Sequence, residues 1–182
     1  MSDELLDICD EDNNLTGESQ TKSTAHREGL RHRTVHVCVY NDKGEILLQK
    51  RADNKDIYPG LWDMSVAGHV SAGEEPVVSA SRELAEEIGI QVEPQDLVFS
   101  HLGSAVYRSS EINEKVFYYA YLYRFDGEIE KLKLQTAEVQ AIKFFSIPEL
   151  LRSFKDEPQN FCPHQDYWQK YFEKIEIIVD KK

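Results

Sequence analysis

Hydrophobic and polar positions alternate in several short stretches of this chain, which is typical of β-strands that bury one face. The clearest examples are TVHVCVY at Thr34–Tyr40 and KVFYYAYLYRF at Lys115–Phe125, both rich in β-branched or aromatic residues. The NDKG sequence at 41–44, directly after the first of these strands, has turn composition, so Glu45–Lys50 is expected to return as the second arm of a hairpin. Further strands are predicted at Leu61–Val66, Asp96–Val106 and Val139–Phe145.

Helical spacing predicts a short helix from Pro148 to Arg152 and a C-terminal helix at about His164–Ile178. Residues 1–24 are polar, and we expect a short strand or a partly disordered lead-in there, with the strand favoured. The chain contains no internal repeat and no low-complexity linker, and its length of 182 residues suits one domain. Strands flanked by helices predict an α/β sandwich formed by residues 1–182 as a single domain.

One parity of the strand at Lys115–Phe125 is aromatic at every position after Lys115, so these rings share one face of the strand. The stripe comprises Phe117, Tyr119, Tyr121, Tyr123 and Phe125. We favour core packing against a helix, and the alternative is a stacking platform for a ring of a ligand.

The acidic balance of the chain limits its partners. The net charge of −12 argues against a nucleic-acid polymer, and a protein of this charge needs metal ions or a local basic patch to bind phosphates. No apolar run suits a membrane span, and the acidic N-terminus is unlike a signal peptide. Cys9, Cys38 and Cys162 are odd in number and far apart, so we expect reduced thiols in a cytoplasmic protein. The sequence indicates no oligomeric state.

The stretch from Gly68 to Ile90 carries the strongest chemical pattern. Its helix is expected to begin in the turn after Gly73 and to end at Gly89, which suits a left-handed C-terminal residue. Glu83, Glu86 and Glu87 then fall on one helix face, with Arg82 able to pair with Glu86. A solvated acidic face is the plain interpretation. The sharper one is a site for Mg²⁺ or Mn²⁺, which prefer carboxylate oxygens and bridge to phosphates.

The spacing of this stretch resembles the Nudix box. The match is Gly68, five residues, Glu74, seven residues, Arg82-Glu83-Leu84, one residue, Glu86-Glu87, one residue and Gly89-Ile90. The resemblance implies an α/β/α sandwich with a mixed sheet and a loop-helix-loop catalytic motif. It also implies a Mg²⁺-dependent hydrolase (Mn²⁺ being the alternative ion) that cleaves a phosphoanhydride bond in a nucleoside diphosphate linked to another moiety.

The resemblance assigns roles to individual residues. Glu83, Glu86 and Glu87 are implied to bind the metal with the backbone carbonyl of Gly68, while Arg82 orients the carboxylates. The general base is implied to be a box glutamate or one in a distant loop. Glu138, just before the strand at Val139–Phe145, is our distant candidate, and behind it come Glu111 and Glu114. For each of these, a plain surface glutamate is the alternative.

Outside the box the chain resembles isopentenyl-diphosphate isomerase, a Nudix relative. This likeness is carried by the histidines, by Arg51 and Lys55, by PGLW at Pro59–Trp62 and by SVAGH at Ser65–His69. It implies a second metal site, or its remnant, at His26, His32 and His69, and a diphosphate clamp at Arg51 and Lys55, for which an exposed basic loop is the alternative.

Two departures from the isomerase favour the hydrolase. The isomerase has a catalytic cysteine where this chain has Ala67, and a methyl group cannot transfer a proton. The isomerases also carry a degraded box, whereas this one is complete. Isomerisation of isopentenyl diphosphate and a non-catalytic nucleotide- or diphosphate-binding module are the remaining alternatives. The box says nothing about the group attached to the diphosphate.

Overall fold

The alternating strand at residues 31–40 is the centre of a seven-stranded mixed sheet in the computed structural model, which describes residues 3–110, 112–163 and 165–179. This strand, β3 (Arg31–Tyr40), pairs in parallel with β8 (Asn113–Arg124) and antiparallel with β4 (Ile46–Arg51) and β6 (Val66–His69). The other strands of the sheet are β5 (Trp62–Asp63), β7 (Val98–Arg108) and β9 (Val139–Phe145).

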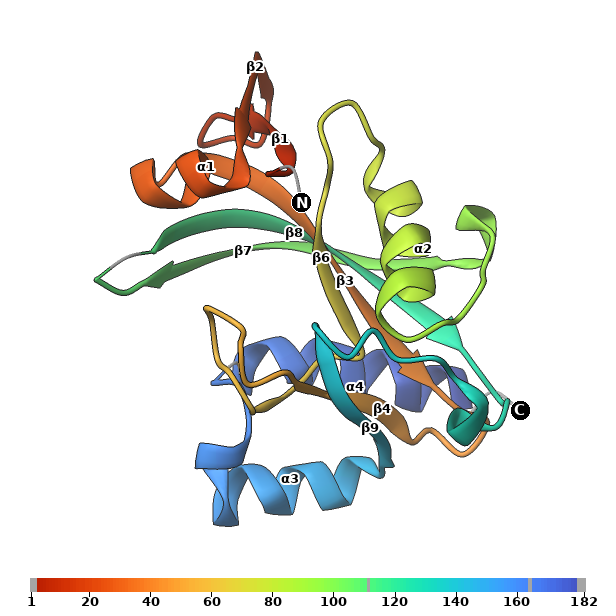
Figure 1. Cartoon of the computed structure of the whole chain (residues 1–182). Coiled ribbons are helices and arrows are strands. Elements are labelled where there is room, and N and C mark those ends of the chain that lie inside the picture. Colours follow the sequence, from red (N-terminus) through yellow and green to blue (C-terminus); the bar gives the residue numbers. More distant parts are fainter. Residues whose placement is uncertain (1–2, 111, 164, 180–182) are drawn as a thin grey trace.

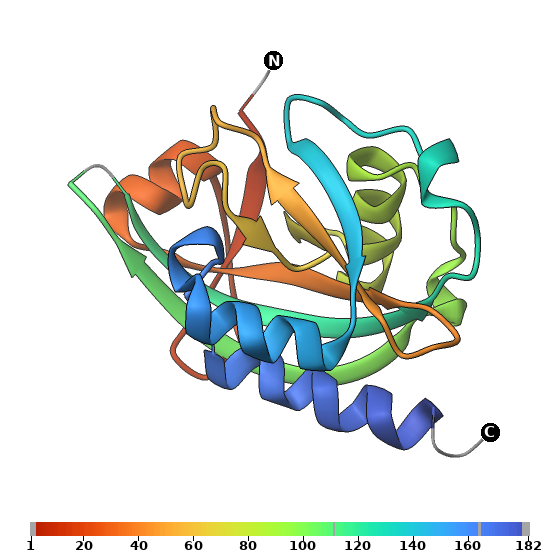
Figure 2. The same ribbon diagram turned by 90° about the horizontal axis from the view of Figure 1, so that it is seen from below.

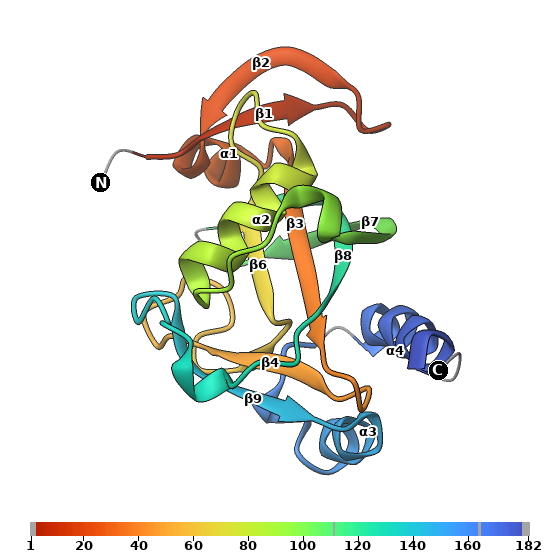
Figure 3. The same cartoon turned by 90° about the vertical axis from the view of Figure 1, so that its right-hand side faces the viewer.

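Both faces of the sheet are covered, which explains why β3 is buried along most of its length. Val35, Val37 and Val39 face the core beneath helix α2 (Pro76–Glu87). Cys38 and Tyr40 face the opposite core, beneath α3 (Ile147–Asp156) and α4 (Gln165–Val179). Figure 3 shows α2 and α4 on opposite sides of β3 and β8, and Figure 2 looks at the face that α3 and α4 cover. The predicted α/β/α sandwich with a mixed sheet is confirmed.

The predicted strand at Leu61–Val66 is wrong as a single element. The chain instead forms β5, then turns, and forms β6, which continues through Gly68 to His69. Ser65 explains the break because its hydroxyl replaces part of the strand ladder. It accepts a hydrogen bond from the amide of Val39 at 2.8 Å and donates one to the carbonyl of Leu47. The hairpin of β3 and β4 is confirmed, with Tyr40 opposite Ile46.

The N-terminal segment is ordered as a separate two-stranded sheet, so the favoured strand prediction for residues 1–24 is confirmed for the described part. Strand β1 (Leu5–Cys9) pairs with β2 (Leu15–Thr21), and helix α1 (Lys22–Glu28) follows. We did not predict α1. Thr21 caps its start, and Gly29 ends it in a left-handed conformation with φ 65°.

The N-terminal hairpin lies against the loop that enters α2 (Figure 1). The amide of Ala72 donates to the carbonyl of Leu5 at 2.8 Å, and the amide of Gly73 donates to the Asp7 carboxylate at 2.7 Å. The Ser71 hydroxyl donates to Glu4 at 2.8 Å. These bonds fix the entry of the α2 helix relative to residues far away in the sequence.

Four of the five rings of the predicted aromatic stripe pack into or around the core under α2, whereas Phe117 lies under the guanidinium of Arg31. Tyr121 is buried there, and Tyr119, Tyr123 and Phe125 pack around that core. All three cysteines are free and buried. Among the described residues, no helix is long and apolar enough to cross a membrane.

Candidate active site

The helix of the Gly68–Ile90 stretch ends as expected but begins later than predicted. It begins at Pro76 with Glu75 as the N-cap, and Gly89 follows its end with φ 75°. Glu74 and Glu75 therefore precede the helix instead of forming its first turn. Glu83 and Glu87 lie on its buried side, whereas the Glu86 side chain is half exposed.

Gly68 lies directly against Glu83. A Cβ atom on residue 68 would lie 2.1 Å from Cδ and 2.4 Å from Oε1 of the Glu83 side chain, well inside van der Waals contact. With any larger residue at this position, the Glu83 side chain would have to shift. The backbone of β6 at Gly68 and the Glu83 side chain therefore lie in close contact.

Arg82 holds the acidic side chains together. Its Nη1 atom donates to Glu83 at 2.7 Å and to Glu86 at 3.2 Å, the latter being the expected i, i+4 pair. Its Nη2 atom donates to Glu74 at 3.1 Å and to the carbonyl of His69 at 3.2 Å. The guanidinium thus fixes two box carboxylates relative to β6 and the loop before α2.

Two of the box carboxylic acids are strongly perturbed. Burial raises the pKa of Glu83 to about 7, although the Arg82 guanidinium opposes this shift. Burial, reinforced by the charge of Glu83, raises the pKa of Glu87 to about 8. The side-chain amide of Gln49 on β4 donates to Glu87 at 3.0 Å. Buried carboxylates that stay ionised at neutral pH need more positive charge than Arg82 provides, and a divalent cation fits this donor set.

The box faces a cavity of about 710 Å³. It reaches from α2 to the loop after β4, to the N-terminal part of β8 and to α4. The predicted residues that line it are Gly68, Arg82, Glu83, Glu86, Glu87, Arg51, Lys55, Glu138, His26 and His69. His32 is fully buried behind the lining, and Glu111 lies outside the described residues.

The two predicted basic residues of the cavity, Arg51 and Lys55, are each engaged by an acid. Arg51 donates from Nη1 to Asp63 at 3.2 Å and from Nε to the carbonyl of Ile57 at 2.9 Å. Lys55 donates to the carboxylate of Glu138. The side chains of Arg51 and Lys55 are 13% and 23% exposed and line the cavity wall.

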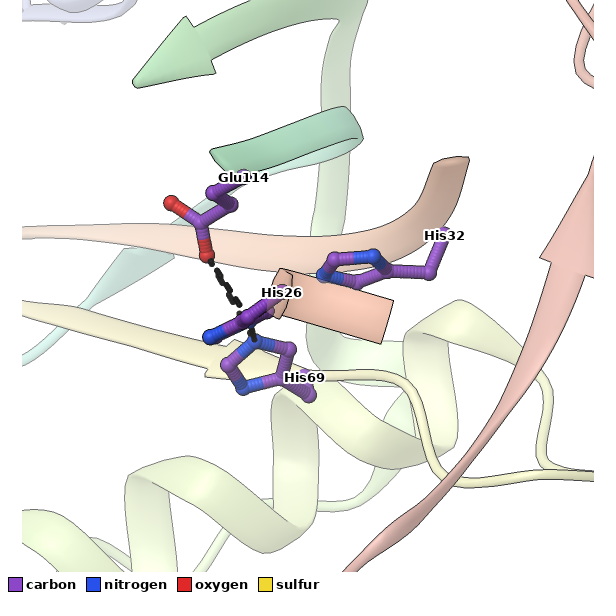
Figure 4. A group of neighbouring side chains, drawn as sticks. All are labelled: His26, His32, His69 and Glu114. Atoms are coloured by element: carbon purple, nitrogen blue, oxygen red, sulfur yellow. Dashed lines mark hydrogen bonds and ion pairs between the residues drawn. The ribbon is translucent and has the colours of Figure 1, made fainter. Parts of the chain in front are cut away.

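A second cluster lies beside the box and contains His26, His32, His69 and Glu114 (Figure 4). The side chains come from α1, β3, β6 and β8 and point toward one another, with one ligand atom of each within 4.8 Å of all the others. Glu114 lies 3.4 Å from Nε2 of His26 and 3.6 Å from Nε2 of His69. Glu114, which we considered as a distant base, therefore pairs with the histidines.

This cluster has the chemistry of a metal site. Burial lowers the pKa of His26 and His32, and it lowers the pKa of His69 well below its usual value, so the imidazoles are neutral as metal ligands must be. The Nδ1 atom of His32 contacts the carbonyl of Leu30 at 3.0 Å, while its buried Nε2 atom has no hydrogen-bond partner among the described residues. Three imidazoles and one carboxylate suit a transition metal such as zinc or manganese.

Sequence reasoning missed several residues of the site. The strongest missed residue is Gln49, a buried polar residue that directly follows the apolar residues of β4. Tyr118 has the opposite parity to the aromatic stripe, and its ring stacks on His36 with centroids 4.8 Å apart. Glu4 and Lys22, from the N-terminal segment, also line the cavity, and nothing in their local sequence indicated it.

An α/β/α sandwich that carries a complete acidic box on a loop-helix-loop defines a protein of the Nudix class. The NUDIX domain model matches residues 30–165, so this chain belongs to the Nudix family.

Relatives of the chain include hydrolases and isomerases by name. Nudix hydrolase 3 of Arabidopsis thaliana is 34% identical over 98% of this chain, and the chain spans 24% of that longer protein. Isopentenyl-diphosphate Delta-isomerase of Serratia proteamaculans is 36% identical over 69% of each chain. The crystal structure of DR0079 from Deinococcus radiodurans has the same fold, with a TM-score of 0.63 and 20% identity over 85% of this chain and 90% of that one.

Proposed function

We propose that this protein is a divalent-metal-dependent hydrolase that cleaves a phosphoanhydride bond in a nucleoside diphosphate linked to another moiety. The observation that carries the proposal is one cavity that joins the complete box to two basic side chains, Arg51 and Lys55. Nudix hydrolases generally use Mg²⁺ or Mn²⁺ and act on compounds that contain a diphosphate, which supports the assignment.

In this proposal Glu83, Glu86 and Glu87 hold the metal with the carbonyl of Gly68. The chemistry that a divalent cation supplies at such a site is neutralisation of the diphosphate oxygens and a lower pKa for water. Arg82 positions the carboxylates through its contacts to Glu83 and Glu86.

Arg51 and Lys55 hold the diphosphate, and Glu138 is the general base. The attacking water gives its proton to Glu138, and its oxygen forms the new bond to phosphorus. The bridging oxygen leaves with the electron pair of the broken P–O bond. Glu138 suits this role because it lines the cavity beside Lys55, one of the two residues proposed to bind the diphosphate.

The histidine cluster is proposed as a second metal site. His26, His32, His69 and Glu114 would hold the ion, and the buried Nε2 atom of His32 supports this, since such an atom needs a partner. Titration of the purified protein with Mn²⁺ or Zn²⁺ should show tight binding that is lost in His69→Ala and retained in Glu87→Gln. Equal binding by both variants would contradict a separate site.

The main test is a panel of phosphoanhydrides with Mg²⁺ or Mn²⁺, in which products are identified by mass spectrometry. Glu86→Gln and Glu87→Gln should each lower turnover by about 10²-fold or more, as expected when a catalytic metal is lost. Glu75→Gln is the matched control, because Glu75 precedes the same helix but is exposed and does not line the cavity. Unchanged turnover in Glu86→Gln and Glu87→Gln would refute the assignment of the box.

Isomerisation of isopentenyl diphosphate is the second candidate, favoured by the histidine cluster and by the names of some relatives. Ala67 argues against it, since the methyl group of alanine cannot transfer a proton. Proton NMR of isopentenyl diphosphate incubated with the protein decides the matter, and formation of the dimethylallyl product would reverse the ranking. Tight nucleotide binding without any product would instead indicate a binding module.

A further inference from the structure

Lys55 and Glu138 form an ion pair across one wall of the cavity, although they are far apart in the sequence. Their side chains are 23% and 33% exposed, so the pair is partly open to solvent. Contacts of this kind are weak and exchange partners readily. The same two residues are the ones proposed to bind the diphosphate and to accept the proton.

The backbone around Glu138 is fixed on two sides. The amide of Gln135 donates to the carbonyl of Glu87 at the end of the box helix, at 2.9 Å. The amide of Ala52 donates to the carbonyl of Glu138 at 2.9 Å, and Val139 pairs with Arg51 on β4. Since these bonds hold both segments to the box, the Lys55–Glu138 contact can open by side-chain rotation alone.

Among the described residues, Lys55 is the only cation that forms an ion pair with Glu138. Arg82 is bonded to Glu74, Glu83 and Glu86, and Arg51 is bonded to Asp63. Burial is the main reason that the pKa of Glu87 is raised, but Lys55 lowers that pKa and Glu138 raises it. Both charges of the pair therefore lie within electrostatic range of the box.

We propose that the diphosphate group of the substrate opens the Lys55–Glu138 pair and thereby frees the general base. Lys55 exchanges the carboxylate for phosphate oxygens, which carry more negative charge. Glu138 then loses its counter-charge only when substrate is bound, and its carboxylate turns to the attacking water. The inference rests on the proposed hydrolase function, and it makes Lys55 a positioning residue for the base as well as a phosphate ligand.

The exchange has a thermodynamic signature in binding. Breaking the pair opposes diphosphate binding, so removing the Glu138 charge should tighten binding by about two- to fivefold, which is the range for a partly exposed ion pair. This gain requires Lys55. Simple repulsion between Glu138 and the ligand would also be relieved by the substitution, but that relief would persist without Lys55.

A double-mutant cycle separates the two effects. Calorimetry with methylenediphosphonate, a diphosphate that cannot be hydrolysed, is carried out in Mg²⁺ with the wild type, Glu138→Gln, Lys55→Met and the double variant. We expect Glu138→Gln to bind more tightly than the wild type by about two- to fivefold. We expect Lys55→Met and the double variant to bind more weakly than the wild type and equally to each other.

Two matched controls come from the same fold. Lys50→Met removes a neighbouring lysine that does not line the cavity, and Glu149→Gln removes a comparable surface pair with Lys143. Both should leave the affinity unchanged. Thermal denaturation of each variant checks that the fold is intact.

Three results would overturn the proposal: equal tightening by Glu138→Gln with and without Lys55, no tightening at all, or no binding of the probe by the wild type. Failure of the hydrolase function would look different. It would appear as turnover that survives in Glu86→Gln and Glu87→Gln, or as the absence of turnover on the phosphoanhydride panel, whatever the binding cycle gives.

Discussion

Replacing Gly68 with alanine adds one carbon atom where β6 meets the box helix. An ideal Cβ atom there lies 2.1 Å from Cδ of Glu83, and carbon atoms at rest are about 3.5 Å apart, so the carboxyl group must move by about 1.4 Å. Glu83 is only 9% exposed and its carboxylate is bonded to Arg82 at 2.7 Å, so it has little room to move.

Two measurable effects follow from this displacement. Overpacking of a buried site costs about 1–3 kcal/mol, which lowers the melting temperature by about 2–4 °C for each kcal/mol in a chain of this size. A ligand displaced by about 1 Å lowers turnover by about 10²-fold. Gly68→Ala should therefore lose most of its activity while it remains folded at 25 °C.

The assay compares Gly68→Ala with Gly127→Ala. A Cβ atom on residue 127 would lie 2.5 Å from the ring of Phe125, which is a similar clash outside the cavity. Circular dichroism melts in the presence and absence of Mg²⁺ are combined with turnover on the best phosphoanhydride. Gly127→Ala should lose stability but keep its stabilisation by Mg²⁺. Wild-type turnover and wild-type Mg²⁺ stabilisation in Gly68→Ala would refute the reasoning.

Three other predictions concern parts of the fold away from the box carboxylates. Burial lowers the pKa of His101 to about 4, so the unfolded chain binds more protons than the folded chain between pH 4 and 6.5, and the free energy of unfolding falls as the pH falls through that range. His101→Phe should recover about 1 kcal/mol of this free energy at pH 5, measured by denaturant titration. An unchanged dependence of stability on pH in this variant would contradict the prediction. Because Cys9, Cys38 and Cys162 are buried, a thiol reagent should modify them only after unfolding, and rapid labelling of the native protein would show that a thiol is accessible. Asp7→Ala removes the hydrogen bond from the amide of Gly73, so it should raise the Mg²⁺ concentration needed for activity. The control Asp12→Ala, at an exposed position, should leave that concentration unchanged. Equal Mg²⁺ dependence of the two variants would show that the N-terminal hairpin does not position the loop before α2.

The box could be predicted because its information is local. Gly68, Glu83 and Gly89 lie within one stretch of 23 residues, and helical spacing alone puts the carboxylates on one face. The main strands were also predictable, because alternation of polar and apolar residues reports burial of one face. The helix α1 was missed because only Ala25 of its seven residues is buried, so it has no apolar period.

Other parts of the site depend on pairing that a single sequence does not reveal. Glu114 meets the histidines because β8 runs parallel to β3, with His32 opposite Val116. Lys55 meets Glu138 because β9 pairs with β4. From the sequence alone, Glu138 and Glu114 were both candidates for the general base. The strand pairing distinguishes them, because it brings Glu138 to Lys55 and Glu114 to the histidines.

The N-terminal hairpin and α1 have a consequence for how this protein can be divided. They lie outside residues 30–165, which the family model matches, yet they contribute Glu4, Lys22 and His26 to the cavity wall. A fragment cut at the family boundary would keep every residue of the box and lose one ligand of the histidine cluster. The segment that the family model matches and the lining of the cavity therefore have different borders. Loss of activity in a fragment of 30–165 would indicate loss of part of the cavity wall, because the box itself is retained.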